Sequence, residues 1–460
     1  MKRFICLCLL WLPLALFAQQ PVVLHSPGDY PWRILGNAGF SAGMAQFTCL
    51  AISPAGVPFV AFADSVNSLK ATVMKFNGTS WMVAGTPGLS MGQVIWPRIV
   101  FSPSGELYLS YIDIGNNTKA TVKKFNGTTW SNVGVPGFTS SAGADFITLA
   151  FTPAGVPYVA FLDAGAGVKA SVMKFNGTSW VNVGPAGFTP SAAVFTAIAC
   201  NGAGVPYVAF RDEGNTGKAS VMKFDGSGWV NVGNPGFSVT SVLYTGIAVS
   251  SSGEPYVAFV NSDQDEKATV MKFNGSAWVN VGSAGFTAGT AYYISFALSP
   301  SGKPYVAFMD GANMNRATVM RYEGTAWVAV GQPGFSPGQA LDFSLAFGAT
   351  DDPYIAFGDV ANGVRATVMA GGWPGGIETS ETGLFSIYPN PATRELFIKA
   401  VRQDEKVISL KITDTRGNLL WESTLSDQLI RINVGDWRPG ICIARLTTDR
   451  NSYCRKFVKN

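Results

Sequence analysis

Residues 70–81 read KATVMKFNGTSW, and close variants of this stretch recur along most of the chain. Each unit holds four short apolar runs separated by turn residues such as Asn77-Gly78, which suit a type I′ turn with positive φ at both central residues. Four-stranded antiparallel units of this length, repeated in series, predict the blades of a β-propeller. A tryptophan marks each unit at intervals of 49 or 50 residues: Trp32, Trp81, Trp130, Trp180, Trp229, Trp278 and Trp327.

The ends of the repeat set the number of blades and the way in which the ring closes. The first strand of a unit begins seven times, near Phe47, Trp96, Phe146, Phe195, Tyr244, Tyr293 and Asp342. The seventh unit lacks the pattern of a fourth strand, but residues 32–36, WRILG, have that pattern before the first unit. Pairing of the two ends removes the open edge of the ring. The sequence therefore predicts an all-β, seven-bladed β-propeller over residues 30–371, with the last blade closed by the N-terminal strand.

The N-terminus carries a targeting segment. Met1-Lys2-Arg3, an apolar run to Phe17 and then Ala18 predict a secretory signal peptide over residues 1–18. The apolar run is shorter than the ~20 residues that a membrane span needs, and no later stretch is long and apolar enough. We therefore expect no membrane span in the mature protein.

Charge and histidine content exclude several classes of function. The net charge of +4 comes from the N-terminus and from residues 384–460, which hold 13 Lys and Arg against 8 Asp and Glu. The repeat region is slightly acidic, so we expect no nucleic-acid partner, which would need a basic stripe. His25 is the only histidine, which excludes His-based triads and multi-His metal sites. We expect neither a metal nor a cofactor.

A second pattern occupies the C-terminus. Residues 372–383 have the composition of a linker. In residues 384–460, alternating apolar positions predict a small immunoglobulin-like β-sandwich, and the spacing of Cys442 and Cys454 leaves open whether they form a disulfide. Four motifs follow in order: Tyr388-Pro389-Asn390-Pro391, Asp414-Thr415-Arg416-Gly417, Pro439-Gly440-Ile441 and Lys456-Phe457-Val458-Lys459.

These ordered motifs resemble the type A sorting domain of proteins exported by the type IX secretion system of Bacteroidota. The resemblance implies that the folded propeller passes through the periplasm to the cell surface or the medium. The implied partners are the secretion machinery and a protease that removes the sorting domain. The repeat region resembles secreted bacterial propellers, with a general kinship to kelch-like and galactose-oxidase-like architecture. The residues assigned to the sorting signal are Tyr388, Pro389, Asn390, Pro391, Gly417, Gly440, Lys456 and Lys459.

Acidic and basic residues recur at fixed positions around the loop between the second and third strands. They should face each other across a hairpin, as ion pairs or as side chains that stabilise the turn. The alternative is a charged rim that meets a ligand. A general acid and a general base need different environments to separate their pKa values, whereas these equivalent sites repeat a single environment. The repeat therefore argues against an enzyme. The pairs are Asp64/Lys70, Asp113/Lys119, Asp163/Lys169, Asp212/Lys218, Asp310/Arg316 and Asp359/Arg365.

The aromatic residues that open the first strands have two interpretations. They either pack between blades or form a stacking surface around the channel mouth. Because identical blades cannot make a unique site, departures from the repeat are further candidates for ligand binding. The alternative for Arg98 is a buried ion pair with Asp145 or Asp342. The ligand-binding candidates are Trp96, Arg98, Asp145, Arg211, Tyr244, Tyr293 and Asp342.

Two hypotheses of function follow. The first is a secreted or cell-surface binding protein that holds an extracellular glycan or a protein on this propeller face. The second is an extracellular hydrolase or lyase acting on polysaccharide through Asp145, Asp342 and Arg98. Repetition favours the first, because multivalent contact uses equivalent blades.

Overall fold

The computed structural model describes residues 32–262, 266–371, 385–389, 391–400, 407–414, 418–424, 429–448 and 452–460. The predicted signal peptide, residues 1–18, and the predicted linker, residues 372–383, lie outside the described residues. The chain divides into two compact units, one within Pro27–Gly372 and one that holds the C-terminal strands. Across the described ranges, no helix is long and apolar enough to cross a membrane.

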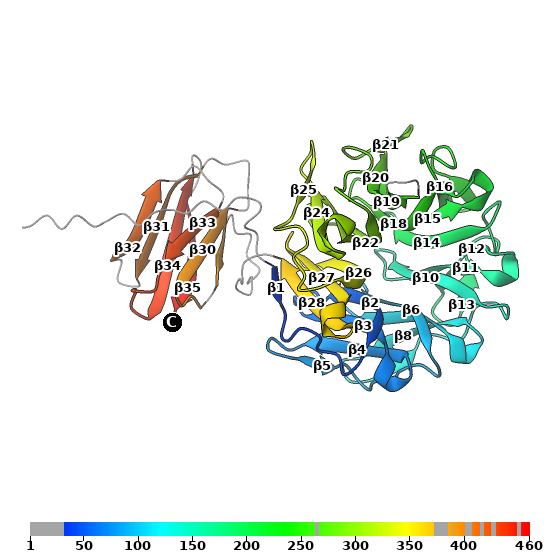
Figure 1. Ribbon diagram of the computed structural model, residues 1–460, viewed down its shortest axis with the longest axis horizontal. Coiled ribbons are helices and arrows are strands. Elements are labelled where there is room, and N and C mark those ends of the chain that lie inside the picture. The colour runs from blue at the N-terminus through cyan, green and yellow to red at the C-terminus, as the bar shows by residue number, and fades with distance from the viewer. Residues whose placement is uncertain are drawn as a thin grey trace, which may run out of the picture. The chain divides into compact units, whose positions relative to one another are not determined.

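Seven four-stranded antiparallel sheets form the first unit, and their first strands contact one another in a closed ring (Figure 1). The predicted seven-bladed propeller is confirmed. Blade 1 comprises β2 (Ala45–Ile52), β3 (Pro58–Asp64), β4 (Lys70–Phe76) and β5 (Trp81–Val83). Blades 2 to 4 comprise β6 (Val94–Phe101), β7 (Leu107–Asp113), β8 (Lys119–Phe125) and β9 (Trp130–Asn132); β10 (Ala144–Phe151), β11 (Pro157–Asp163), β12 (Lys169–Phe175) and β13 (Trp180–Asn182); and β14 (Ala193–Cys200), β15 (Pro206–Asp212), β16 (Lys218–Phe224) and β17 (Trp229–Asn231). Blades 5 to 7 comprise β18 (Val242–Val249), β19 (Pro255–Asn261), β20 (Ala268–Phe273) and β21 (Trp278–Asn280); β22 (Ala291–Leu298), β23 (Pro304–Asp310), β24 (Arg316–Tyr322) and β25 (Trp327–Ala329); and β26 (Ala340–Phe347), β27 (Pro353–Asp359), β28 (Arg365–Gly371) and β1 (Trp32–Ile34).

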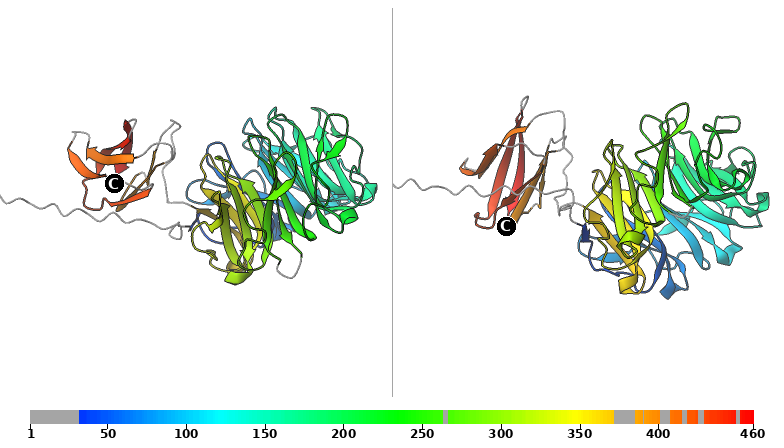
Figure 2. Two further views of the ribbon diagram at one scale, coloured as in Figure 1. Left: turned by 90° about the horizontal axis from the view of Figure 1, so that it is seen from above. Right: turned by 45° about the horizontal axis from the view of Figure 1, so that its top comes forward.

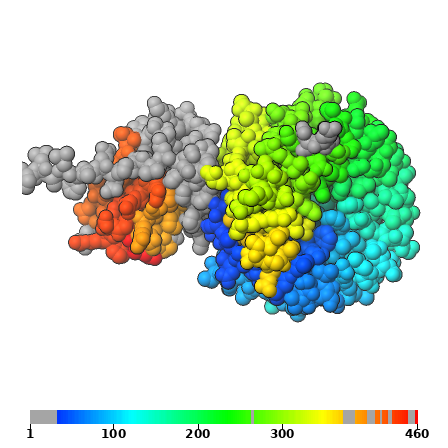
Figure 3. Space-filling model, viewed as in Figure 1, coloured from blue at the N-terminus to red at the C-terminus, as the bar shows by residue number. Residues whose placement is uncertain are grey.

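The N-terminal strand completes the last blade, as the sequence predicts. β1 pairs antiparallel with β28, with Trp32 opposite Gly371 and Ile34 opposite Met369. In Figures 1 and 3, the blue N-terminal strand lies against the yellow seventh blade. The ends of a 340-residue repeat region, Trp32 to Gly371, thus share one sheet, and the last blade has no missing strand.

The tryptophan that opens each fourth strand joins its blade to the preceding one. Its indole N–H donates to a carbonyl just past the preceding fourth strand, at 2.6 to 2.8 Å, in all seven blades. Trp32, for example, donates to Val330. In six blades the indole also stacks on a phenylalanine, as Trp32 does on Phe335 at 4.0 Å between ring centroids. Leu89 takes that place beside Trp130.

The hydrophobic core lies between the blades. Residues of the second strand alternate between its two faces, and both faces are covered by neighbouring blades. Val60 therefore packs with Ala356 and Val368 of blade 7, while Ala61 packs with Leu109 of blade 2. All four of the blade 1 and blade 7 residues are completely buried, which explains why second strands read as nearly continuous apolar runs.

The second unit is a two-sheet β-sandwich, as predicted (Figure 2). Leu396, Ile412 and Phe457 are completely buried between the sheets. Cys442 is a free, buried thiol. One sheet has the order β29 (Phe385–Tyr388), β30 (Glu395–Ala400), β33 (Leu429–Asn433), and the other β32 (Leu419–Thr424), β31 (Val407–Asp414), β34 (Gly440–Thr448), β35 (Ser452–Lys459).

The sorting-signal residues are spread along this sandwich. Tyr388 ends β29 and is buried, Pro389 and Pro391 lie between β29 and β30, and Gly440 begins β34. Lys456 and Lys459 belong to the last strand, β35, where Lys459 is 4% exposed. Asn390 and Gly417 lie outside the described residues.

Deletion of residues 30–36 should unfold the propeller at markedly lower temperature. The deletion exposes the edge of β28 and removes the Trp32 bond to Val330, so we expect a loss of several kcal/mol in the free energy of unfolding and faster aggregation. Deletion of residues 19–26, which spares β1, serves as the control. Equal melting temperatures of the two variants, measured by calorimetry, would show that the ring closes without β1.

Candidate binding surface at the channel mouth

The first strand begins, and the second strand ends, at the same end of the propeller. In blade 1 this follows from the pairing of Ala45 with Asp64. The aromatic residue near the start of each first strand lies at this end. Six residues, here called the collar, make up the series: Phe47, Trp96, Phe146, Phe195, Tyr244 and Tyr293, and Asp342 occupies the seventh position.

Each collar residue is the third residue of its strand, so the predicted strand starts are two residues late. The reason is a β-bulge: the register shifts between Gln46 and Cys49 and at the same place in every blade. The collar residues and Asp342 have φ between 47° and 55°, a left-handed conformation that is unfavourable for side chains of this size. Such backbone strain is concentrated at functional sites, and here it occurs seven times.

The collar rings contact one another from blade to blade. Consecutive centroids lie 4.9 to 5.6 Å apart, from Phe47–Trp96 to Tyr244–Tyr293, which is the usual distance for paired aromatic rings. Phe47, Trp96 and Tyr244 also pack against the clusters between blades. All six keep part of their surface exposed, and Tyr293 is 37% exposed. The collar therefore combines the two interpretations: it packs at the blade junctions and presents aromatic surface to solvent.

Asp342 closes the collar between Tyr293 and Phe47. Its carboxylate accepts a hydrogen bond from the Phe47 backbone N–H at 2.8 Å, and its backbone carbonyl accepts one from the Thr48 hydroxyl. Burial raises the pKa of Asp342 above its ordinary value, and the Phe47 N–H and the positive charge of Arg98 offset part of that rise. The collar thus includes one largely buried carboxylate, bonded to the backbone of Phe47.

The structure does not form the buried pair suggested for Arg98. Asp145 Oδ1 instead accepts hydrogen bonds from the Trp96 indole N–H at 2.6 Å and from the Phe146 N–H at 2.8 Å. The Arg98 guanidinium lies 5.9 Å from the centroid of the Trp96 ring, and its buried Nε has no hydrogen-bond partner among the described residues. Asp145 therefore fixes the orientation of Trp96 rather than neutralising Arg98.

Arg211 lies beside the collar and is held by a local partner. It pairs in register with Val194, the neighbour of Phe195. Its Nε lies 2.7 Å from Glu213 Oε1. The structure thus brings Trp96, Arg98, Asp145, Tyr244, Tyr293 and Asp342 to the channel mouth, with Arg211 at its edge.

The repeated Asp/Lys pairs stand opposite each other across the hairpin, as with Asp212 and Lys218. Of the two alternatives for these residues, the structure forms the turn-stabilising one: within the described ranges, no aspartate of the series forms an ion pair with its own partner. The aspartates are at most 4% exposed and stabilise the turn. Asp212 accepts from the Gly214 N–H at 3.1 Å, the Asn215 amide at 2.8 Å and the Ser220 hydroxyl at 2.9 Å.

The same network reaches the next loop. The hydroxyl that donates to the aspartate accepts a hydrogen bond from a later glycine, as Ser220 does from Gly236 at 2.8 Å. Asp64, Asp310 and Asp359 have the same three kinds of donor, two, three and eight residues further on. Sequence reasoning gave turn stabilisation only as one alternative, without its donors, because it considered only the cation six residues later. The Ser or Thr eight residues later was the available signal.

A ring of seven blades followed by a C-terminal sandwich defines a β-propeller protein with a second all-β domain. Residues 386–460 match the family described as secretion system C-terminal sorting domain. The predicted sorting domain is therefore present, and it indicates secretion to the cell surface or the extracellular space. No curated protein matches the chain.

Three solved structures are similar to this chain. An ulvan lyase from a new family of polysaccharide lyases is 10% identical, with a TM-score of 0.50 over 73% of this chain and 94% of the lyase. A fungal alcohol oxidase in complex with copper is 11% identical, with a TM-score of 0.48 over 95% of this chain and 100% of the oxidase. Aleuria aurantia lectin is 16% identical, with a TM-score of 0.44 over 66% of this chain and 100% of the lectin. At these identities the likeness concerns the fold alone.

Replacement of Asp212 by Ala should destabilise the propeller far more than replacement of Lys218 by Ala. The first leaves three donors without their acceptor, which costs about 2–3 kcal/mol, whereas the second removes a partly exposed cation and costs less than about 0.5 kcal/mol. Urea unfolding of both variants measures the difference. Equal losses would restore the ion pair as the main role of the series.

Proposed function

We propose that this protein is a secreted or surface-displayed binding protein that holds a glycan on its collar. The observation that carries the proposal is the unbroken contact of six partly exposed aromatic rings from blade to blade. Aromatic rings offer rigid, amphipathic contact area at a low cost in conformational entropy. A sugar ring has one flat apolar face that stacks on such a surface.

Polar groups at the same mouth complement the hydroxyl groups of a sugar. The hydroxyls of Tyr244 and Tyr293 donate and accept hydrogen bonds, and the Asp342 carboxylate accepts them. The Arg98 guanidinium adds donors beside Trp96. A chain of similar sugar units suits a ring of similar binding positions, because neighbouring contacts add avidity without a new kind of contact.

Binding rather than catalysis is proposed for Asp145 and Asp342. The raised pKa of Asp342 would suit a general acid. A second, independent carboxylate is needed for glycoside hydrolysis in most families, and Asp145 Oδ1 already accepts two hydrogen bonds within the chain. A released-sugar assay on any bound glycan distinguishes the two functions, since products above the background would favour the hydrolase or lyase.

Export belongs to the same proposal. The sorting domain supports passage of the folded propeller through the periplasm and the type IX machinery. A surface protease would then remove the sorting domain, leaving the propeller released or attached at the surface. The propeller lies in a compact unit of its own, so this removal leaves the collar intact.

Replacement of Tyr293 by Ala should weaken glycan binding about five- to thirtyfold, which corresponds to about 1–2 kcal/mol. This ring is the most exposed of the collar, so its loss disturbs the core little. A glycan array on the purified wild-type protein supplies the probe, and calorimetry measures the affinity. Tyr293→Phe, which keeps the ring, should bind within about threefold of wild type.

Two results would contradict this prediction. Wild-type protein that binds no glycan on the array would remove the proposed ligand class. Tyr293→Ala with wild-type affinity for every glycan bound would place the binding surface elsewhere on the protein.

Truncation after Gly383 should leave a folded propeller in the periplasm of the native host, because the sorting domain is lost while the blades remain complete. Cell fractionation and immunoblotting locate the protein, and the full-length chain is the control. Normal appearance of the truncated protein in the medium would contradict export through this domain.

A further inference from the structure

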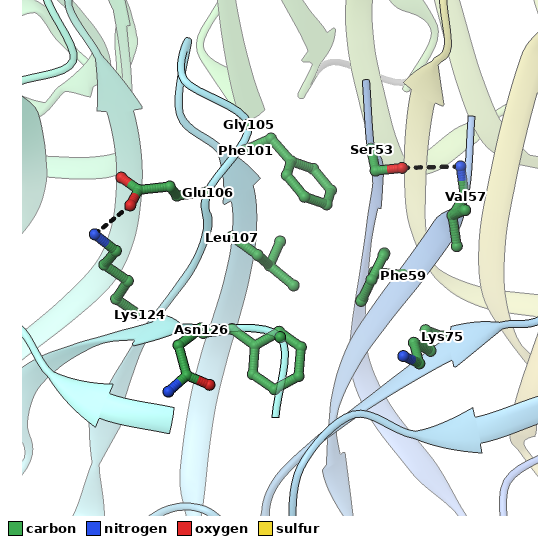
Figure 4. Close-up of a pocket in the computed structure, with 12 residues that line it drawn as sticks. Ser53, Val57, Phe59, Lys75, Phe101, Gly105, Glu106, Leu107, Lys124 and Asn126 are labelled. Carbon is green, nitrogen blue, oxygen red and sulfur yellow. Dashed lines mark hydrogen bonds and ion pairs between the residues drawn. The ribbon is translucent and has the colours of Figure 1, made fainter. Parts of the chain in front are cut away.

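A cavity lies at the opposite end of the blades from the collar, between blades 1 and 2 (Figure 4). Strand β2 runs from the collar at Phe47 to Ile52, at the far end of blade 1. The turns between the first and second strands of blades 1 and 2 lie at that far end and line the site. The cavity measures about 630 Å³, which is a volume typical of small-molecule sites. It shares no residue with the collar.

This cavity gathers departures from the blade repeat. Phe59 stands where the other six blades have tyrosine, and Leu107 stands where the other six have proline. The Phe59 ring meets Phe101 of the next blade edge to face, at 5.5 Å between centroids. In Figure 4, Phe59 and Val57 form one wall, and Phe101 and Leu107 form the other. Phe59 and Leu107 are therefore the apolar lining residues that are particular to this junction.

Leu107 also changes the backbone at the cavity. Its N–H, which proline lacks, lets the pairing of β7 with β8 extend by one residue, to Phe125. The equivalent pairing in each of the other blades begins one residue later. Phe125, which also lines the cavity, is thereby paired with Leu107.

The charge at the cavity is unbalanced. In blades 2 and 5, the lysine near the end of the third strand has a carboxylate partner: Lys124 lies 2.5 Å from Glu106, and Lys272 lies 3.1 Å from Glu254. In blade 1 the position of that glutamate is occupied by Val57. Lys75, which lines the cavity and is partly buried, forms no ion pair with any described residue.

We propose that this cavity binds a small molecule with a flat, apolar ring system and one anionic group. The ring system packs against Phe59, Phe101 and Leu107, and the anionic group pairs with the Lys75 ammonium. Apolar walls with a few placed polar groups are typical of such sites, and a charge-assisted hydrogen bond supplies the selectivity for an anion. The proposal is independent of glycan binding at the collar.

Anilinonaphthalene sulfonate is a suitable probe, since it combines a flat aromatic body with one sulfonate. The full-length protein should bind one equivalent, measured by fluorescence titration and calorimetry. The uncharged analogue N-phenylnaphthylamine should bind about tenfold more weakly, because it forgoes the ionic hydrogen bond.

Replacement of Val57 by Glu tests the role of Lys75, with the melting temperature of the variant as a check of its fold. It gives blade 1 the arrangement already present in blades 2 and 5, and the new carboxylate both pairs with Lys75 and repels the sulfonate. We expect at least a tenfold loss of affinity for the probe. Val156→Glu is the matched control in blade 3, where Val156 and Lys174 hold the same two positions and the probe affinity should not change.

Three results would overturn the proposal. One is a Val57→Glu variant that binds the sulfonate as tightly as wild type. Another is an equal loss of affinity in Val156→Glu, which would mean that the probe has no preference for this junction. The third is equal affinity of wild type for the sulfonate and its uncharged analogue, which would remove the anionic requirement.

Discussion

The hydrogen bond from each fourth-strand indole to the preceding blade is the interaction on which the ring depends. A fourth strand here has only three residues, too short to hold its place by strand pairing alone. The indole N–H and its stacked phenylalanine join that strand to its neighbour. Since each bond runs to the preceding blade, the last one is satisfied only if Trp32 reaches Val330, and the N-terminal strand must therefore complete blade 7.

Repetition and departure from repetition produce two different kinds of surface. The bulge recurs in every blade and places an aromatic side chain or Asp342 at the same position each time. The collar is therefore a continuous band of similar aromatic rings. The cavity between blades 1 and 2 arises where Phe59 and Leu107 break the pattern. A band of equivalent positions suits an extended, repetitive ligand, and a single unlike junction suits one small molecule.

Most of the fold was predictable because its determinants are local and repeated. The period, the turn at Asn77-Gly78 and the strand-like residues 32–36 were sufficient to predict seven blades and their closure. The bulge was not predictable, because a positive φ at Phe47 has no signature in a non-glycine residue. The choice between ion pairs and turn stabilisation was not predictable, because the burial of Asp212 depends on three donors that no single spacing reveals. The cavity was missed because its two unusual residues belong to different blades.

Closure by β1 also means that the strands of the propeller are not paired in the order in which they are synthesised. Trp32 and Val330 are 298 residues apart in sequence, and β28, the partner of β1, is the last strand of the repeat region. The first propeller strand to be synthesised is therefore the last that can find its place, after every intervening blade exists. Such a long-range contact is slow to form. Until it forms, the edge of β28 remains a template for strands of other chains, so the time before ring closure is the period of greatest exposure to aggregation.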